Sequence, residues 1–192
     1  MKLFYSPTSP YARKVRVVLL EHGLQDRVEL IVVSPLEAGA ERVIPNPLGK
    51  IPALELDDGS PLYDSPVICQ YLLALAGFAP PDWQALRLQA LGNGVIDAAY
   101  NTAMERRRPQ SQQSSLWLAR WDAAIRRSLL AMEEEVGLLG PEFGLTAISW
   151  ACALGYLDFR MGDLSWRENI PQLAEWYDAA ATRLSLQATE PA

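Results

Sequence analysis

The chain has 192 residues, 49% of them hydrophobic, and its 17 basic and 23 acidic residues give a net charge of −6. This apolar share is enough for the packed core of one or two domains, which excludes an intrinsically disordered chain. The acidic balance disfavours nucleic acid as a partner, because the surface repels phosphate backbones.

The first 76 residues alternate between strand-like and helix-like segments. The strand-like segments are short apolar or β-branched runs at residues 2–5, 28–33, 53–56 and 61–63. The helical segments cover residues 10–21, where Gly23 is a C-terminal stop, and residues 67–75. The turn sequence Asp57-Asp58-Gly59-Ser60 joins the last two strands into a hairpin. This order predicts one mixed sheet with helices packed on it, in an α/β domain over residues 1–76.

Strand signals stop after a linker at residues 77–83, whose glycine and prolines break regular structure. Residues 84–192 instead repeat apolar side chains at helical spacing, which predicts an all-helical domain. Its apolar series cover residues 88–103, 117–136, 147–157 and 171–183. The plan predicts a cleft between the two domains.

The third of these helices is apolar nearly all round, which predicts that it is central and buried. Thr146 is its expected N-cap, and Leu145 with Trp150 is a candidate hydrophobic staple. The tryptophans of this half are expected in the core rather than in a ligand platform. They are Trp117, Trp121, Trp150 and Trp176.

A serine stands at the start of the first predicted helix, in Thr8-Ser9-Pro10. Serine followed by proline is a common helix start, so one interpretation of Ser9 is a structural cap. The alternative is chemical, because a helix N-terminus has a partial positive charge and a hydroxyl there can donate a hydrogen bond to a thiolate. A free thiol has a pKa of about 8.5, and lowering that pKa by about two units makes most of it anionic at neutral pH.

Two further segments are candidate binding elements. In NPLGKIPAL, Ile51 and Pro52 either simply open a strand or, across a cis bond, present the N–H and C=O of Ile51 to an extended ligand. In YDSPVI, the pair Asp64–Ser65 either caps the second helix or clamps an amino-acid end. In that clamp the N–H and hydroxyl of Ser65 hold a carboxylate and Asp64 holds an ammonium.

Together, these motifs resemble the N-terminal domain of the glutathione S-transferases in their order and spacing. The matching segments are TSPYARKV, NPLGKIP and DSPVI, and the closing helix and tail are also similar to that family. The resemblance implies an α/β thioredoxin-like N-terminal domain plus an all-α C-terminal helical domain, the glutathione S-transferase fold. It also implies a cytoplasmic homodimer with a role in detoxification.

The resemblance assigns the site residues. TSPYARKV is most similar to the serine-type classes, in which Ser9 matches the catalytic serine. Asp64 stands where the family more often has Glu, and Ser149 stands where the family usually has Asp to close a capping box. The positions matched to glutathione binding, with Pro52 as the family's cis-proline, are Ser9, Lys50, Ile51, Pro52, Asp64 and Ser65.

The leading hypothesis is an enzyme in which Ser9 stabilises the glutathione thiolate for attack on a small hydrophobic electrophile. The alternatives are a glutathione-dependent isomerase or peroxidase, or an interaction protein of the same fold without turnover. Tyr5, Ser6 and Thr8 are rival hydroxyls for the thiol. The absence of cysteine at position 9 argues against thiol-transfer or dehydroascorbate chemistry.

Other residue classes point to fewer functions. Cys69 and Cys152 stand alone in apolar surroundings, and His22 is the one histidine, so neither a disulfide framework nor a metal site is expected. We expect no membrane partner either, because no apolar stretch reaches the roughly 20 residues of a span. The run 106–108 of three arginines is either a solvated helix end or an edge of the cleft that attracts an acidic substrate.

Overall fold

The computed structural model describes residues 1–191, which divide into two compact units. The first unit comprises residues 1–81 and the C-terminal segment that begins at Leu184, and the second comprises residues 82–183. No helix of the described part of the chain is long and apolar enough to cross a membrane.

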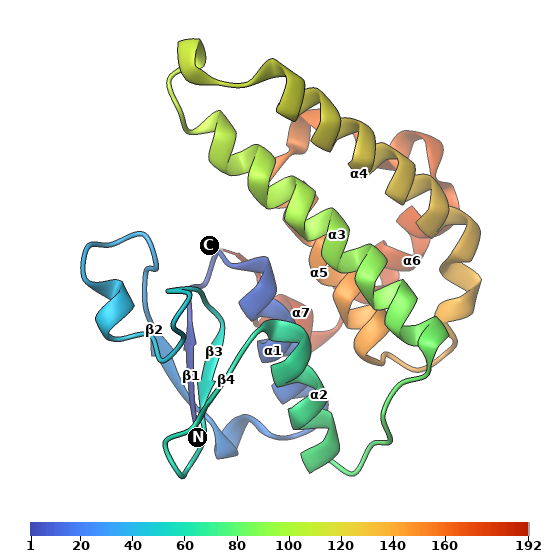
Figure 1. The fold of residues 1–192 in the computed structure, drawn as a ribbon. Helices are drawn as coiled ribbons and strands as arrows, with labels where there is room; N and C mark the ends of the chain where they lie inside the picture. The colour runs from blue at the N-terminus through green and yellow to red at the C-terminus, as the bar shows by residue number, and fades with distance from the viewer. Residues whose placement is uncertain (192) are drawn as a thin grey trace. The chain divides into compact units, whose positions relative to one another are not determined.

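A four-stranded mixed sheet with strand order β2-β1-β3-β4 forms the centre of the first unit (Figure 1). Its strands are β1 (Lys2–Tyr5), β2 (Glu29–Val32), β3 (Ala53–Glu55) and β4 (Pro61–Leu62). β1 pairs in parallel with β2 and antiparallel with β3, which pairs antiparallel with β4. The predicted mixed sheet is therefore confirmed, with β2, β3 and β4 each shorter than its apolar run.

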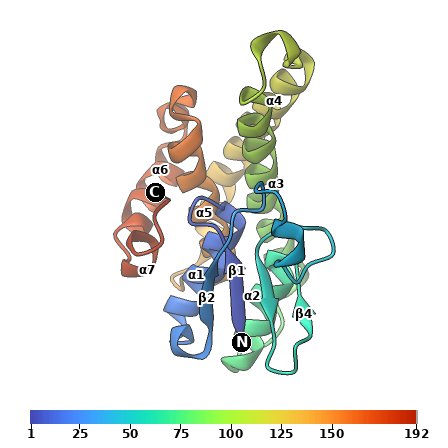
Figure 2. The same cartoon turned by 90° about the vertical axis from the view of Figure 1, so that its left-hand side faces the viewer.

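Two helices, α1 (Pro10–Glu21) and α2 (Ser65–Leu75), pack against each other and lie on the same side of this sheet (Figure 2). Side chains alternate between the faces along a strand, so Phe4 and its neighbour Leu3 face opposite sides. Phe4 packs with Ala53 and Ile44, so the long loop before β3 supplies the core on one face.

The C-terminal segment, with the short helix α7 (Leu184–Gln187), runs along α1. Arg13, only 5% exposed, donates from Nη2 to the carbonyl of Leu186 at 2.9 Å and from Nε to Thr189 Oγ1 at 3.4 Å. A buried guanidinium needs such acceptors, because an unpaired charge away from water is costly. The end of the chain therefore belongs to the core of the first unit.

The second unit consists of helices joined by connections that contain short 3₁₀ helices. The long helices are α3 (Trp83–Arg106), α4 (Ser115–Glu135), α5 (Leu145–Arg160) and α6 (Pro171–Ala181). α3 packs against both α4 and α5, and every residue of α5 from 147 to 157 is buried. This confirms the central, buried helix that its uninterrupted apolar composition predicted.

The start of α5 differs from the prediction. The helix begins at Leu145 with Gly144 as its N-cap, so the assignment of Thr146 as the N-cap is wrong. The hydroxyl of Thr146 donates instead to the carbonyl of Ala85 at 3.4 Å and accepts from Gln89 Nε2 at 3.5 Å. Both partners lie on α3, so a tertiary contact takes the hydroxyl that the local pattern assigned to capping.

The tryptophans also divide. Trp150 is fully buried, as expected, but Trp117 is 48% exposed and stacks on Trp121 with ring centroids 5.5 Å apart. The core assignment of Trp117 is therefore wrong. The reason is that α4 fully buries only Ile125, Leu129 and Met132, which lie in its second half.

Two glycines of α3 provide a matched test of the α3–α5 contact. A Cβ on Gly92 would lie 2.9 Å from Cδ1 of Trp150 and 3.3 Å from the backbone of Ser149, whereas a Cβ on Gly94 meets nothing within 4 Å. We predict that Gly92→Ala lowers the free energy of unfolding by about 1–3 kcal/mol through overpacking. Gly94→Ala should raise it by about 0.5–1 kcal/mol, because alanine is the better helix former. Urea unfolding of both variants measures this, and changes of the same sign would contradict the packing argument.

Candidate functional site

The register of the strands defines one edge of the sheet. Phe4, near the end of β1, pairs with Ala53, the first residue of β3. Leu54 pairs with Leu62, the last residue of β4. Since β3 runs antiparallel to both neighbours, the ends of β1 and β4 lie beside its start.

All three predicted segments enter or leave the sheet at this edge. The loop with Ser9 follows β1, Ile51 and Pro52 precede β3, and Asp64 and Ser65 follow β4. α1 and α2 also begin there, and the first N–H groups of a helix have no acceptor within the helix itself. The segment with Ser9 is thus brought together with two segments that lie more than 40 residues later in the sequence.

Ser9 is the N-cap of α1, as its interpretation as a cap predicted. Its backbone is extended, with φ −81° and ψ 119°, and its Oγ accepts a hydrogen bond of 3.2 Å from Ala12 N. A hydroxyl has two acceptor lone pairs and one O–H donor. Capping therefore leaves the proton of Ser9 available to donate at the same time.

The rival hydroxyls make other contacts. Ser6 Oγ and Thr8 Oγ1 are hydrogen-bonded to each other at 3.2 Å. Tyr5 is 9% exposed, and the centroid of its ring lies 5.0 Å from the guanidinium carbon of Arg16. Its side chain is therefore packed in the protein rather than exposed to a ligand. Ser9 is the candidate that lies at the helix N-terminus itself.

The side chain of Asn46 holds the loop before β3 by hydrogen bonds, a role that the sequence patterns did not predict. Its Nδ2 donates to the carbonyl of Lys50 at 2.9 Å, and its Oδ1 accepts from Leu48 N at 3.0 Å. Gly49 adopts φ 62° between them, in the left-handed region that favours glycine. The available signal was an asparagine at the head of a turn, since asparagine often bonds the backbone two residues on.

This hydrogen-bonded loop, residues 46–50, precedes the strand start that the resemblance matches to ligand binding. The Ile51–Pro52 peptide bond is cis, as the resemblance implies, and the side chain of Lys50 is exposed. Asn46, which is only 4% exposed, therefore holds the carbonyl of the residue next to Ile51.

The start of α2 contains Asp64 and Ser65. The N-cap is Asp64, with φ −91° and ψ −160°, and its carboxylate accepts no capping hydrogen bond from α2. Ser65 is the first residue of the helix and is 1% exposed. The carboxylate is thus not used by the helix, while a buried hydroxyl lies beside the helix N-terminus.

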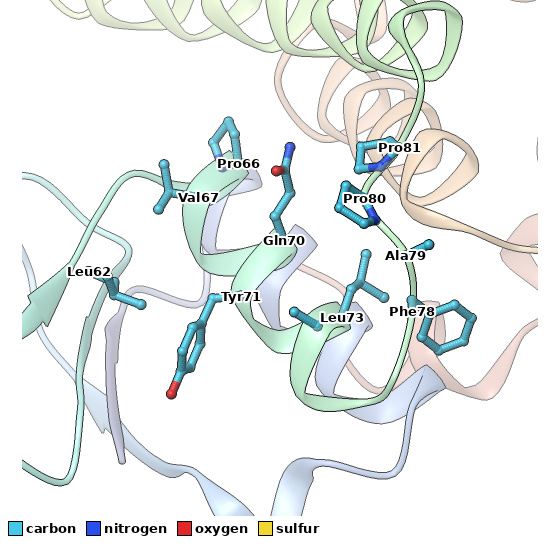
Figure 3. A pocket seen from close by; sticks show the side chains of 11 residues that line it. Leu62, Pro66, Val67, Gln70, Tyr71, Leu73, Phe78, Ala79, Pro80 and Pro81 are labelled. Carbon is cyan, nitrogen blue, oxygen red and sulfur yellow. The ribbon is translucent and has the colours of Figure 1, made fainter.

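A separate apolar cavity of about 420 Å³ is bounded by α2, by Leu62 of β4 and by the segment 78–81 (Figure 3). None of the residues matched to glutathione binding lines it. The lining residues are Leu62, Pro66, Val67, Gln70, Tyr71, Leu73, Ala74, Phe78, Ala79, Pro80 and Pro81. Among residues 1–191, no group of three or more His, Cys, Asp or Glu side chains is placed to hold a metal ion.

Two family models match the chain. The model for the glutathione S-transferase N-terminal domain matches residues 8–75, and the model for the C-terminal domain matches residues 116–179. The first match contains every residue assigned to the glutathione site.

Relatives match over the whole length. The chain is 36% identical over 201 aligned residues to a protein of Escherichia coli strain K12 named "Uncharacterized GST-like protein YibF", covering 100% of this chain and 98% of that protein. A crystal structure of a glutathione transferase family member from Pseudomonas fluorescens Pf-5, with bound glutathione, has 44% identity and a TM-score of 0.93, covering 100% of this chain and 98% of that one. A second structure described in the same words, with bound S-(propanoic acid)-glutathione, has 43% identity and a TM-score of 0.91 over 100% of both chains.

Proposed function

We propose a function from an established premise: the chain belongs to the glutathione S-transferase family. Its fold is the predicted one, an α/β thioredoxin-like N-terminal part and an all-α C-terminal part. The protein binds glutathione at the sheet edge and transfers its thiolate to a small hydrophobic electrophile. It is a serine-type member that acts in the cytoplasm.

The observation that carries the proposal is the meeting of two helix N-termini and one strand start at a single edge. Glutathione is a tripeptide with an α-amino-acid end, a thiol and a terminal carboxylate, so it needs recognition at several points. The backbone N–H and C=O of Ile51 suit its extended peptide, and anions are stabilised at helix N-termini. The bound glutathione of the Pseudomonas fluorescens relative supports the same ligand here.

Each end of glutathione has a matching group. The N–H and hydroxyl of Ser65 hold the α-carboxylate, and Asp64 holds the ammonium through a charge-assisted hydrogen bond. Lys50 and the main chain of Ile51 contact the rest of the peptide, in the loop that Asn46 organises. The O–H of Ser9 then donates to the thiolate.

The chemistry is nucleophilic attack by sulfur. In a displacement, the C–S bond forms while the bond to the leaving group breaks, and the leaving group takes the electron pair. Ser9 and the N-terminus of α1 stabilise the anionic form of sulfur, which is the nucleophile. Their contribution is to raise the fraction of thiolate at neutral pH.

Titration calorimetry with glutathione at millimolar concentrations tests binding, and turnover of an aryl halide tests transfer. We expect both. No heat of binding at millimolar glutathione would contradict the site, whereas binding without turnover of any electrophile would favour the interaction protein.

Asp64→Asn is predicted to weaken glutathione binding by about 1.5–3 kcal/mol, roughly tenfold to a hundredfold in dissociation constant. The amide keeps the shape of the side chain but removes the charge that faces the ammonium. Asp26→Asn is the matched control, because Asp26 is an exposed aspartate of the same unit, away from the sheet edge. Equal dissociation constants for the Asp64 variant and the wild type would show that Asp64 does not touch the ligand.

We also propose domains at residues 1–76 and 84–192, joined by the linker 77–83. The compact units divide near this linker, and the segment from Leu184 packs with the first unit.

We further propose that the protein is a homodimer, as the resemblance implies. Light scattering should give about twice the chain mass of 21.3 kDa. The mass of a single chain at working concentration would contradict the dimer.

A further inference from the structure

The C-terminal segment of the chain is hydrogen-bonded along α1. Ser185 donates from its hydroxyl to the carboxylate of Glu21, at the end of α1. Nearer the start of the helix, Arg16 Nη2 donates to the carbonyl of Ala188 at 3.2 Å. α7 lies beside α1 in both views, and the two helices are in contact (Figure 1, Figure 2). The segment therefore runs antiparallel to α1, towards the residues that begin it.

Arg13 makes the contacts nearest to the start of α1. Its Nη2 donates to the carbonyl of Leu186 at 2.9 Å, and its Nε donates to Thr189 Oγ1 at 3.4 Å. Thr189 is 1% exposed, and its hydroxyl donates in turn to the carbonyl of Ser185 at 2.8 Å. The hydroxyl is thus an acceptor and a donor at once, and it links Arg13 to the backbone of the C-terminal segment.

The backbone of Arg13 is bonded to Ser9. Arg13 N donates to the carbonyl of Ser9 at 2.9 Å, which is the first hydrogen bond within the helix, and Ala12 N donates to Ser9 Oγ at 3.2 Å. A single turn of α1 therefore separates the hydroxyl proposed to face the sulfur from the side chain that the C-terminal segment holds.

The first turn of a helix is the part that needs such support. Its N–H groups have no acceptor within the helix, and helix ends fray. A donor that must face a sulfur atom has to be held within about 0.5 Å of its productive position, by neighbours that packing and hydrogen bonds fix in their turn. Arg13, which is 5% exposed, and Thr189 are such neighbours.

We propose that Arg13 is a positioning residue for Ser9, and that Thr189 holds Arg13 in place. The proposal rests on the proposed function, in which the hydroxyl of Ser9 donates to the glutathione thiolate. Arg13 and Thr189 act through the first turn of α1 and do not touch glutathione. Without them the turn moves, the hydroxyl spends less time within hydrogen-bond distance of the sulfur, and the pKa of the bound thiol rises.

Thr189→Val is the first test, because it removes the hydroxyl and keeps both the branched shape and the charge of Arg13. We expect titration of the thiolate absorbance to give a bound-thiol pKa about half a unit higher, and kcat at pH 7 to fall by about 1.5-fold to threefold with the fraction of thiolate. The dissociation constant of glutathione at about pH 5.5, where the thiol is protonated in both proteins, should stay the same. An unchanged thiol pKa would overturn the proposal.

Thr102→Val is the matched control. Thr102 is 2% exposed, and its hydroxyl donates to the carbonyl of Ala98 at 2.8 Å, the same bond to a residue four positions earlier that Thr189 makes to Ser185. Both variants should lose stability in urea unfolding, but only Thr189→Val should shift the thiol pKa. An equal shift in both variants would mean a general effect of stability and would overturn the assignment.

Thr189→Val in a Ser9→Ala background tests the route of the effect. If Thr189 acts through Ser9, the second substitution adds nothing to the shift in thiol pKa that Ser9→Ala causes by itself. A shift of the same size in both backgrounds would contradict a route through Ser9.

Arg13→Lys separates position from charge. Lysine keeps the positive charge but lacks the planar fork that reaches the two acceptors. We expect the thiol pKa to rise as it does in Thr189→Val. A wild-type thiol pKa in Arg13→Lys would mean that the charge alone is sufficient, and would overturn the positioning role.

The positioning role and the proposed function fail in different ways. If Ser9→Ala shifts the thiol pKa and Thr189→Val does not, the proposed function stands and the positioning role fails. If Ser9→Ala leaves the thiol pKa unchanged, activation by serine fails, and the positioning role fails with it.

Discussion

Ser9→Ala is expected to raise the pKa of the bound glutathione thiol by a unit or more and to slow transfer at least about threefold at neutral pH. The variant removes the O–H that donates to the thiolate, while the N-terminus of α1 remains. Because only the anion is the nucleophile, a higher thiol pKa means less thiolate at pH 7. The deficit should shrink as pH rises through the new pKa, since the thiolate then forms without the serine.

Loss of the cap complicates this variant, because Ser9 Oγ also accepts from Ala12 N. Removing an N-cap costs about 1 kcal/mol of stability. Ser114→Ala is the matched control, since Ser114 caps α4 through a hydrogen bond of 3.4 Å from Trp117 N. Both variants should lose similar stability, but only Ser9→Ala should shift the thiolate absorbance titration.

An unchanged titration would mean that Ser9 is a cap alone. The candidates for activating the thiol would then be Tyr5, Ser6 and Thr8. These hydroxyls are weaker candidates than Ser9, because Ser6 and Thr8 are hydrogen-bonded to each other and Tyr5 is packed against Arg16. Tyr5→Phe is the first variant to measure in that case, because it removes the hydroxyl and keeps the ring.

Trp150→Ala is expected to lower the free energy of unfolding by about 3–5 kcal/mol. Trp150 is fully buried, its Nε1 donates to the carbonyl of Leu88 at 2.7 Å, and its ring meets Trp176 edge to face at 6.5 Å. The variant leaves a cavity between α3 and α5 as well as a lost hydrogen bond. Denaturant unfolding monitored by circular dichroism measures the change.

Trp83→Ala is the control for this variant, because Trp83 is the same residue type in the same unit but is 86% exposed. Its effect should stay within about 0.5 kcal/mol. A loss below about 1 kcal/mol in Trp150→Ala would mean that the α3–α5 contact is not a stability centre of the second unit.

Local patterns were enough wherever a few adjacent residues decide the backbone. Ser9 followed by Pro10 predicted the N-cap of α1, because both residues act through their own turn of helix. The apolar run from 147 to 157 predicted a buried helix, because no face of it is suited to water. The grouping of the glutathione motifs relied on their order in the chain and on resemblance, since none of them is specific alone.

Side chains whose partners lie far away in the sequence were predicted less well. Thr146 was assigned to a cap, but its hydroxyl bonds Ala85 and Gln89 of α3. Trp117 fits the apolar spacing of α4, yet the packing leaves it half exposed. The two hydrogen bonds of Asn46 were not predicted, because their role depends on the strand start that follows the loop.

By itself, the sequence thus determined the order of strands and helices, the two-part plan and the residues of the three motifs. Only the tertiary structure decided that those motifs share one sheet edge, and that the hydroxyl of Thr146 bonds residues of α3. The physical reason is range. Backbone preferences are set by neighbours within a turn, whereas pairing, burial and charge neutralisation depend on segments that meet only once the register of strands and the packing of helices are set.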